Sequence, residues 1–472
     1  MGQSFSRLRS VRRSLVALSY LGLAAGTVLI LAAVRYKVNV GIAAAAAGLI
    51  VAATSGGGIV VLTDSLSETV IEPAGLTLLV SIAFITMIGN IMKVSGALDD
   101  LTQGIGRVIR DARIVAFMLP SLVGMLSVPG SSVFSAPLVD SVGRSLGMTR
   151  EQRVTTNVMF RHGWYYIYPI YAPLLMIQQI SGVPYSAFVL PGVIAALAVF
   201  ALTARTVFRK DSLTPERSSS IDDGSIGSCG CSDCSSAKVS PGASVNGRNE
   251  AVIGPGALPA VSARLVFSIL AAASPILVVL LVGVGTSINF SIATALGALT
   301  ALFAAPSDGP YLKEIARRFR EGAVPGIDWQ VVGTVAGTVF FGRTIVNSRV
   351  LASMTAGTGS AVSVLSLFIF GFALPFLSGF IIGSHLPAVG IAGPLLVPLL
   401  SGLPNPAGLV VALYMAASSG YLMSPAHVCF ISTVQYLKAD VSSSWRMMWG
   451  PGGAGLVLGL IFWAVQVAAN LF

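Results

Sequence analysis

The sequence predicts an all-α polytopic membrane protein with two inverted repeats, each of five transmembrane helices plus one re-entrant hairpin. Of its 472 residues, 54% are apolar and only 10% are charged, and the mean hydropathy is +0.83. This composition excludes a soluble globular protein. The two further observations behind the prediction are a series of apolar stretches of about 20 residues, which is the length that crosses a bilayer, and a repeat that relates the two halves of the chain.

Apolar windows predict ten spans. They cover 15–34, 39–62, 73–92, 155–180, 185–207, 264–284, 287–305, 328–346, 407–433 and 451–471. Two further apolar stretches, 114–143 and 361–402, are interrupted in the middle by proline and glycine, which disfavour a continuous spanning helix. We therefore predict that each stretch forms a re-entrant hairpin, which enters and leaves the membrane on one side.

The second half of the chain repeats the first at a nearly constant offset. The first repeat covers 15–208 and the second covers 263–472. Because each repeat contains five spans, an odd number, the two halves must insert with opposite orientation, and their hairpins must enter from opposite faces. The matching pairs include Asn39 with Asn289, Gly89 with Gly342, Pro120 with Pro375, Pro137 with Pro394, and Tyr165 with Tyr421.

Two polar segments lie outside the repeats. The tail 1–14 is basic, and 209–262 is rich in Ser, Gly and Asp, which predicts a flexible cytoplasmic linker. Within the linker, Cys229, Cys231 and Cys234 have a C-x-C-x-x-C spacing that is a weak candidate for a thiophilic metal site, and the alternative is a solvated linker with incidental thiols. The fourth cysteine lies in an apolar span, so no disulfide framework is predicted.

We expect the protein in the plasma membrane, and the distribution of basic residues favours an N-terminus outside, because cytoplasmic loops collect Lys and Arg. In this orientation most of the 29 lysines and arginines are cytoplasmic, and the loop 63–72, with three acidic residues and no base, is outside. Four arginines between positions 7 and 13 favour the opposite orientation, which stays open. The tail also resembles a signal peptide, but an uncleaved first span agrees better with its counterpart in the second half.

The hairpin tips are the first candidate binding sites. Helix N-termini at a break near the midplane present partial positive charge to an anion, and unwound carbonyl groups can hold a cation. The first tip has a Pro-Gly pair followed by two serines, and the second has a Gly-Ser-His turn. The alternative is that these residues only permit close packing. The candidate tip residues are Pro129, Gly130, Ser131 and Ser132, and Gly383, Ser384 and His385.

The span after each hairpin is interrupted too, at Gly163 and Pro169 in the first repeat and at Gly420 and Pro425 in the second. Arg161 lies beside the first of these breaks, and an ionisable group within a span indicates a functional site. The alternative is that Arg161 snorkels to the cytoplasmic interface. Further candidates near the breaks are His162, Ser418, Ser419 and Ser424, and both His385 and His427 are candidates for proton relay or for plain packing.

Several absences narrow the possible mechanism. No Asp or Glu lies deep in a predicted span, because Asp140 and Asp328 are near the ends of theirs. A pump based on paired buried carboxylates is therefore disfavoured. The sequence contains no Walker motif, nucleophile elbow or metal-ligand motif in its spans, so we expect neither an enzyme nor an ATP-driven transporter, and neither a cofactor nor a nucleic-acid partner.

Three segments carry a resemblance to a known family: SVPGSSVFSAPLVD from Ser127, FRHGWYYIYP from Phe160, and SGYLMSPAHVCFISTVQYLKAD from Ser419. They resemble an uncharacterised family of prokaryotic integral membrane proteins grouped with the ion transporter superfamily. Its wider relatives include divalent-anion/sodium symporters and transporters of citrate, arsenite and gluconate. The resemblance covers most of the chain except the tail and the linker.

This resemblance implies two inverted five-span repeats with hairpins, elevator-type movement and often a homodimer. The characterised dicarboxylate branch of the superfamily has Ser-Asn-Thr at its hairpin tips. Here the tips have Ser131-Ser132 and Ser384-His385. Specificity for a dicarboxylate and for sodium therefore does not follow from the resemblance.

Together, these observations predict a secondary active transporter of a small, anionic solute, coupled to Na⁺ or H⁺. One alternative is a channel-like ion permease, which needs no coupling residue. Another is a membrane scaffold or signalling protein with a transporter fold, in which the cysteine-containing linker would be the working part. The expected partners are the lipid bilayer, the solute and a second copy of the chain.

Overall fold

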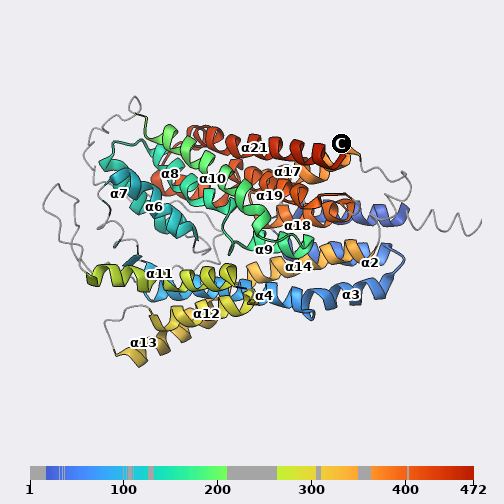
Figure 1. Cartoon of the computed structure of the whole chain (residues 1–472), viewed down its shortest axis with the longest axis horizontal. Coiled ribbons are helices and arrows are strands. Elements are labelled where there is room, and N and C mark those ends of the chain that lie inside the picture. Colours follow the sequence, from blue (N-terminus) through green and yellow to red (C-terminus); the bar gives the residue numbers. More distant parts are fainter. Residues whose placement is uncertain are drawn as a thin grey trace, which may run out of the picture.

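The computed structural model describes residues 17–98, 111–125, 132–209, 263–304, 310–348, 363–400 and 403–471, with short gaps at 31, 34–35, 37 and 287 and a few isolated residues between 99 and 110. These residues form helices and no strands. The helices lie roughly along one axis (Figure 1). Among the described residues, six helices are long and apolar enough to cross a membrane. The predicted class, an all-α membrane protein, is confirmed. The six are Pro73–Val94, Ser186–Val207, Val266–Gly283, Val364–Ile382, Pro406–Leu437 and Val441–Asn470. Val364–Ile382 consists of three consecutive helical elements, and Pro406–Leu437 consists of two helices with a short break after Met423.

The first half begins with helical residues 17–30, α2 (Val40–Thr54), α3 (Gly58–Val70) and α4 (Pro73–Val94). The prediction of one span over 39–62 is wrong, because the chain breaks after α2. Gly56 and Gly58 have φ angles of 73° and 47°, and this left-handed conformation, which suits glycine, ends a right-handed helix. The segment 63–72, predicted to be a loop, is therefore mostly helical.

The second half contains a corresponding series of helices and turns. The two series exchange packing partners: α4 packs against α12 and η3, whereas α14 packs against α2 and α3. One apolar cluster includes Ile88 of α4 and Ala298 of α12, and another includes Ala47 of α2 and Phe341 of α14. The elements are α11 (Ala263–Gly285), α12 (Phe290–Ala304), α13 (Tyr311–Arg317), η3 (Arg318–Ala323), η4 (Val324–Gly326) and α14 (Trp329–Asn347).

Helices α2 and α14 approach closely because glycines lie at their crossing. A Cβ atom added at Gly337 would lie 2.0 Å from the carbonyl oxygen of Gly41, and one added at Gly41 would lie 2.5 Å from the carbonyl oxygen of Gly333. Small residues let the backbones of membrane helices come into van der Waals contact. A larger residue at this crossing would separate the two halves of the chain.

Two helical pairs occupy the stretches assigned to hairpins. Helix α6 packs against α7, and α17 packs against α18. In Figure 1, α6 and α7 lie at the left end of the molecule, and α17 and α18 lie toward the right. The elements are α6 (Ala112–Met125), α7 (Ser132–Ser145), α16 (Val364–Phe368), η5 (Ile369–Ala373), α17 (Leu374–Ile382), α18 (His385–Leu396) and η6 (Val397–Leu400).

The largest apolar cluster of the described residues connects α8–α10 with α16–α21 and includes residues of α4 and α14. Two of the helices in this cluster are interrupted. The first changes from α8 to a 3₁₀ turn at Gly163 and resumes as α9 at Ala172, and the second ends as α19 at Met423 and resumes as α20 at Val428. The elements are α8 (Arg150–His162), η1 (Gly163–Tyr166), α9 (Ala172–Ser181), α10 (Ser186–Val207), α19 (Pro406–Met423), α20 (Val428–Leu437) and α21 (Val441–Leu471).

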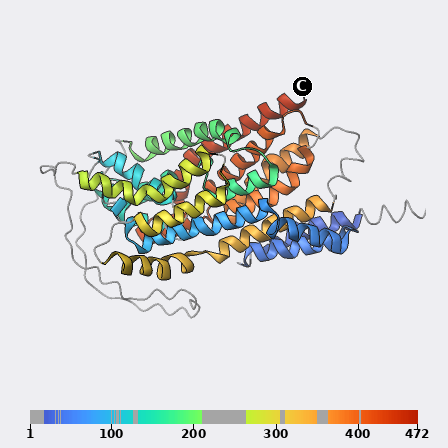
Figure 2. The same cartoon turned by 60° about the horizontal axis from the view of Figure 1, so that its bottom comes forward.

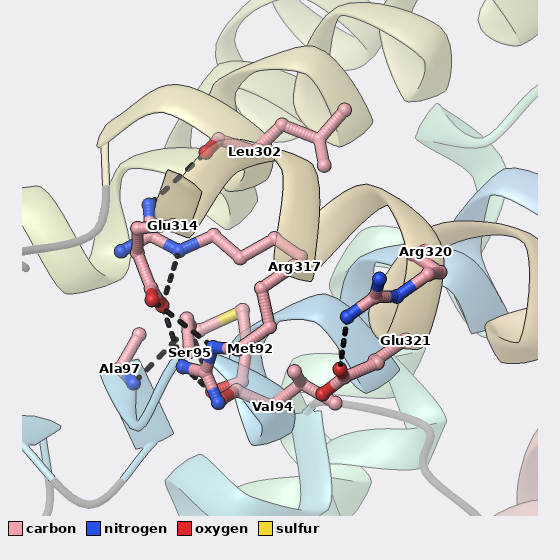
Figure 3. A network of polar contacts seen from close by, with 10 residues as sticks. Met92, Val94, Ser95, Ala97, Leu302, Glu314, Arg317, Arg320 and Glu321 are labelled. Atoms are coloured by element: carbon pink, nitrogen blue, oxygen red, sulfur yellow. Dashed lines mark hydrogen bonds and ion pairs between the residues drawn. The ribbon is translucent and has the colours of Figure 1, made fainter. Parts of the chain in front are cut away.

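Helix α13 lies at the edge of the molecule in both views (Figures 1 and 2), and a polar network holds it there (Figure 3). Arg317 donates from Nη2 to the carbonyl oxygen of Val94 near the end of α4 at 3.2 Å. Arg318 donates from Nη1 to the carbonyl oxygen of Leu302 near the end of α12 at 3.0 Å. Both guanidinium groups also donate to Glu314, at 2.5 Å and 3.3 Å. Cations at helix C-termini are stabilising, so this network fastens α13 to α4 and α12.

We expect Glu314→Gln to lower stability at neutral pH by roughly 1 kcal/mol, the contribution of a typical net hydrogen bond. The hydrogen bond from Arg317 lowers the pKa of the Glu314 carboxyl below its ordinary value of 4.5. Because this carboxyl has a lower pKa in the folded than in the unfolded chain, its charged form stabilises the folded chain fully at pH values above 4.5. This contribution is lost as the pH falls through the lowered pKa. Thermal unfolding between pH 7 and pH 3 should therefore show a smaller loss on acidification for the variant than for the native chain.

The control is Glu321→Gln. Glu321 pairs with Arg320, whose side chain is 80% exposed, and an exposed ion pair contributes little. We expect this variant to unfold like the native chain across the pH range. Equal losses in the two variants would contradict the role assigned to Glu314.

Candidate functional site

A cavity of about 440 Å³ lies where the two interrupted helices meet the turn between α17 and α18. Its wall is mostly apolar and aromatic, with a few polar groups, which is typical of a small-molecule site. It is lined by Ile82, Ile85, Thr86, Arg161, Tyr165, Tyr171, Ala172, Pro173, Val331, Gly383, Ser384, His385, Leu386, Tyr421, His427, Val428 and Cys429.

Three helices, α9, α18 and α20, begin at the wall of this cavity. Their N-cap residues, Tyr171, Ser384 and His427, line the cavity, and none of the three makes a side-chain capping hydrogen bond. The first amide groups of a helix have no partner within the helix and carry partial positive charge. Three such ends around one cavity favour an anion.

Arg161 brings a full positive charge to the same cavity. Its side chain is buried, with only 2% of the residue exposed, and Nη1 donates to the hydroxyl oxygen of Ser135 in α7 at 3.3 Å. A Cβ atom added at Gly124 would lie 2.6 Å from Cγ of Arg161, so α6 packs directly on the stem of this side chain. The guanidinium is therefore held inside the protein by the first helical pair, which disfavours the snorkelling alternative.

Aromatic and imidazole rings hold the two breaks against each other. The rings of Tyr165 and Tyr171 stack with centroids 3.9 Å apart. The ring of His427 lies 4.2 Å from that of Tyr421 and 4.5 Å from that of His162. These residues belong to the interrupted helix of the first half and to that of the second. The cluster thus joins the two breaks beside the cavity.

His385 connects the turn before α18 to the rest of the cavity wall. The residue is 1% exposed, and its Nε2 lies 3.2 Å from the hydroxyl oxygen of Ser418 in α19. Its ring lies 4.8 Å from that of Tyr414, whose hydroxyl donates to the carbonyl oxygen of Tyr165 at 2.6 Å. The orientation of this imidazole therefore depends on both α19 and η1.

The three serines predicted near the second break are buried but do not line the cavity. Ser418 orients the imidazole described above. The hydroxyl oxygen of Ser419 lies 2.8 Å from that of Tyr166, and Ser424 donates to the carbonyl oxygen of Phe380 at 2.6 Å. These serines therefore support the wall of the cavity through hydrogen bonds to other parts of the protein.

The predicted break at Gly420 is wrong, because α19 continues through this residue to Met423. A Cβ atom at Gly420 would lie 2.1 Å from the carbonyl oxygen of Phe376. The glycine therefore permits α19 and α17 to pack closely, and the chain leaves the helix just before Pro425. His162 is fully buried beside the cavity and is not among its lining residues.

Some predicted residues cannot be placed in the site. Ser132 is the first residue of α7. The other residues predicted at the first tip, and the three linker cysteines, lie outside the described part of the chain. These are Pro129, Gly130 and Ser131, and Cys229, Cys231 and Cys234.

Several cavity residues were not predicted from the sequence, including Thr86, Tyr171, Tyr421 and Cys429. Tyr421 was noted only as a repeat match of Tyr165. The run of aromatic residues from Trp164 to Tyr171 was the available signal for the tyrosines. Thr86 and Cys429 had no such signal, because they are isolated polar residues in apolar stretches.

Comparison with known proteins places the chain in a family. A family model described as "Protein of unknown function (DUF401)" matches residues 17–223 and 258–466. The chain belongs to this family. The two matched stretches contain both interrupted helices and all the cavity-lining residues of this DUF401 protein. No curated protein matches the chain.

Proposed function

We propose that this DUF401 protein is a secondary transporter of a small anionic solute. The observation that carries the proposal is the convergence of three uncapped helix N-termini and the buried Arg161 on one cavity. None of the lining residues is acidic, so no carboxylate there competes with an anion for these positive groups. A volume of about 440 Å³ is suited to a small organic or inorganic anion.

The arrangement of the helices supports alternating access to this cavity. The pair α6 and α7 and the pair α17 and α18 lie toward opposite ends of the molecule (Figure 1), and α4 and α14 each pack against helices of the other half. Both features agree with two inverted repeats that each contain a re-entrant hairpin. Relation to the ion transporter superfamily, elevator-type movement and a homodimer are parts of the same proposal.

Protons are the coupling ion that the cavity favours over Na⁺. A sodium site draws on carbonyl and carboxylate oxygens, whereas the lining residues here have no carboxylate and include His385 and His427. An imidazole can accept a proton, and a bound anion beside it favours the protonated form. A protonated histidine would add positive charge beside Arg161 when the anion is bound, which couples the two binding events.

We expect the two hairpins to be accessible from opposite sides of a plasma membrane, with the end of α7 cytoplasmic. The side chain of Arg144, near the end of α7, is 62% exposed, and Ser363, the N-cap of α16, is exposed. In a chain whose native cysteines are replaced by serine, Ser363→Cys should react with an impermeant thiol reagent added to whole cells. Arg144→Cys should react only after the membrane is permeabilised.

Both single-cysteine variants should react equally in detergent, which controls for local reactivity. Labelling of both positions from the same face of intact cells would contradict the inverted arrangement. If only Arg144→Cys were labelled in intact cells, the two hairpins would still lie on opposite sides of the membrane, but the orientation of the whole chain would be the reverse of the proposed one.

Flux in proteoliposomes tests the transport proposal. We expect purified protein to accumulate a labelled anion against its own gradient when the interior is made alkaline, with inorganic phosphate, a monocarboxylate and a dicarboxylate as the first probes. A sodium gradient should have less effect. Flux that only equalises the probe would favour the channel-like alternative, and absence of both flux and binding for all anions would contradict the proposal.

A further inference from the structure

Three metal-binding side chains from the two interrupted helices meet beside the cavity. His162 is the last residue of α8, whereas His427 is the N-cap of α20 and Cys429 is in its first turn. Their nearest ligand atoms, one from each residue, all lie within 4.8 Å of one another. His162 is far in the sequence from His427 and Cys429 and belongs to the other half of the chain, so only the folded structure brings it to them.

Ring nitrogen atoms of this cluster are available to bind a metal ion. The Nδ1 atom of His162 lies 2.7 Å from the carbonyl oxygen of Val158. A carbonyl oxygen only accepts, so Nδ1 carries the proton and Nε2 keeps its lone pair. Such a bond to the distal nitrogen is the usual support of a metal-binding histidine. Within the described structure, Nε2 of His162 and both ring nitrogens of His427 are buried and have no hydrogen-bond partner.

Cys429 supplies the third donor. It is a free cysteine that lines the cavity and lies in the first turn of α20. Binding of a metal would form the sulfur–metal bond and release the thiol proton to solvent. The bound thiolate would reduce the positive charge that the cation places beside Arg161, which lines the same cavity.

We infer that His162, His427 and Cys429 form a binding site for a thiophilic divalent cation of the Zn²⁺ type. Two imidazoles and a thiolate select such a cation over Mg²⁺ or Ca²⁺, which prefer oxygen. Zn–N distances of about 2.0–2.1 Å and a Zn–S distance of about 2.3 Å place tetrahedral donors roughly 3.3–3.6 Å apart. The donors therefore need to approach by about one ångström, and the fourth position opens to the cavity.

This site does not depend on the proposed transport of an anion. A cation bound there would connect the interrupted helix of the first half to that of the second. Any movement that separates the two breaks would then require its release. The site therefore predicts direct metal binding, which is measurable without any transport assay.

Cobalt is a suitable spectroscopic probe, because Co²⁺ occupies zinc sites and absorbs light when a thiolate coordinates it. The test uses the full chain with Cys229, Cys231 and Cys234 replaced by serine, so that the linker cannot bind the probe. We expect one Co²⁺ per chain with a thiolate-to-cobalt absorption band that Zn²⁺ removes. Cys429→Ser should abolish this band, and His162→Gln or His427→Gln should weaken binding at least about tenfold.

His385→Gln is the matched control. His385 is equally buried and lines the same cavity, but it lies outside the three-residue cluster. It should therefore retain the band and the affinity. A band that survives Cys429→Ser, or a loss in His385→Gln equal to that in His162→Gln, would overturn the inference.

A second measurement needs no substitution in the site and is independent of whether the variants fold. The rate of alkylation of Cys429 in the chain that lacks the linker cysteines can be followed by mass spectrometry. Zn²⁺ should slow this reaction at least tenfold, and Mg²⁺ at the same concentration should leave it unchanged. Alkylation at the same rate with and without Zn²⁺ would also overturn the inference.

Discussion

Replacement of Arg161 with lysine should weaken binding of the proposed anionic solute by about 10- to 150-fold, which corresponds to roughly 1.5–3 kcal/mol. The guanidinium is a planar, permanently charged donor that can offer two parallel hydrogen bonds to an oxyanion, whereas the lysine ammonium is a point charge on a flexible stem. Because Arg161 is held between Gly124 and Ser135, a lysine there would also lose part of this positioning. Arg161→Gln should lose at least as much affinity.

Arg153→Lys provides the matched control for this measurement. Arg153 lies on the same helix and is fully buried, but it pairs with Asp140 of α7 and does not line the cavity. The substitution should reduce thermal stability without changing the affinity for the anion that the flux assay identifies. Equilibrium binding of the anion to the native chain and to the variants tests whether Arg161 contacts the anion. Unchanged affinity in both Arg161 variants would leave the helix N-termini as the positive partners of the anion and remove Arg161 from the site.

The class of the fold could be predicted from composition because a bilayer requires every helical span to contain about 20 mostly apolar residues. Proline and glycine within apolar stretches also indicated interruptions near Pro169 and Pro425. Two glycine-containing positions were interpreted wrongly. Gly56 lies between α2 and α3, and Gly58 begins α3, inside an apolar run that hydropathy treats as continuous. Gly420 lies within a helix, where it permits close packing against α17. Hydropathy and propensity cannot distinguish these cases, because the neighbour that decides between a turn and a tight contact is far away in the sequence.

The cavity itself was predictable only in part. Arg161 stood out because a charge within a span is costly, and the Gly383-Ser384-His385 turn stood out because it interrupts an apolar stretch. The contact between His162 and His427 could not be predicted in this way. It depends on how two interrupted helices from different halves pack against each other, whereas the sequence indicated each histidine only as a separate candidate in its own segment. The serines of α19 illustrate the opposite error, since polar side chains beside a break can be fully used by the protein's own hydrogen bonds.

Gly383→Ala should destabilise the protein by roughly 2–5 kcal/mol and also weaken anion binding. Gly383 ends α17 with a φ of 65°, a left-handed conformation that costs a residue with a Cβ atom roughly 1–2 kcal/mol. The added Cβ would also lie 2.6 Å from the carbonyl carbon of Ala426. This atom belongs to the backbone of the second break, so the turn must move away from it, and overpacking of this kind costs about 1–3 kcal/mol more.

Gly182→Ala separates the two contributions. Gly182 ends α9 with a φ of 71°, and a Cβ atom there would meet no other atom within 4 Å. This variant should therefore lose only the conformational contribution and keep its affinity for the anion. Thermal unfolding and equilibrium binding of both variants measure the difference, which reports the contact between the turn and the second break. If both variants lost the same stability and kept full affinity for the anion, the turn at Gly383 would not be in tight contact with the second break. The cavity would then tolerate a displacement of this turn. A larger loss in Gly383→Ala, together with weaker binding, would show that the anion site depends on the close approach of α17 and α18 to the start of α20.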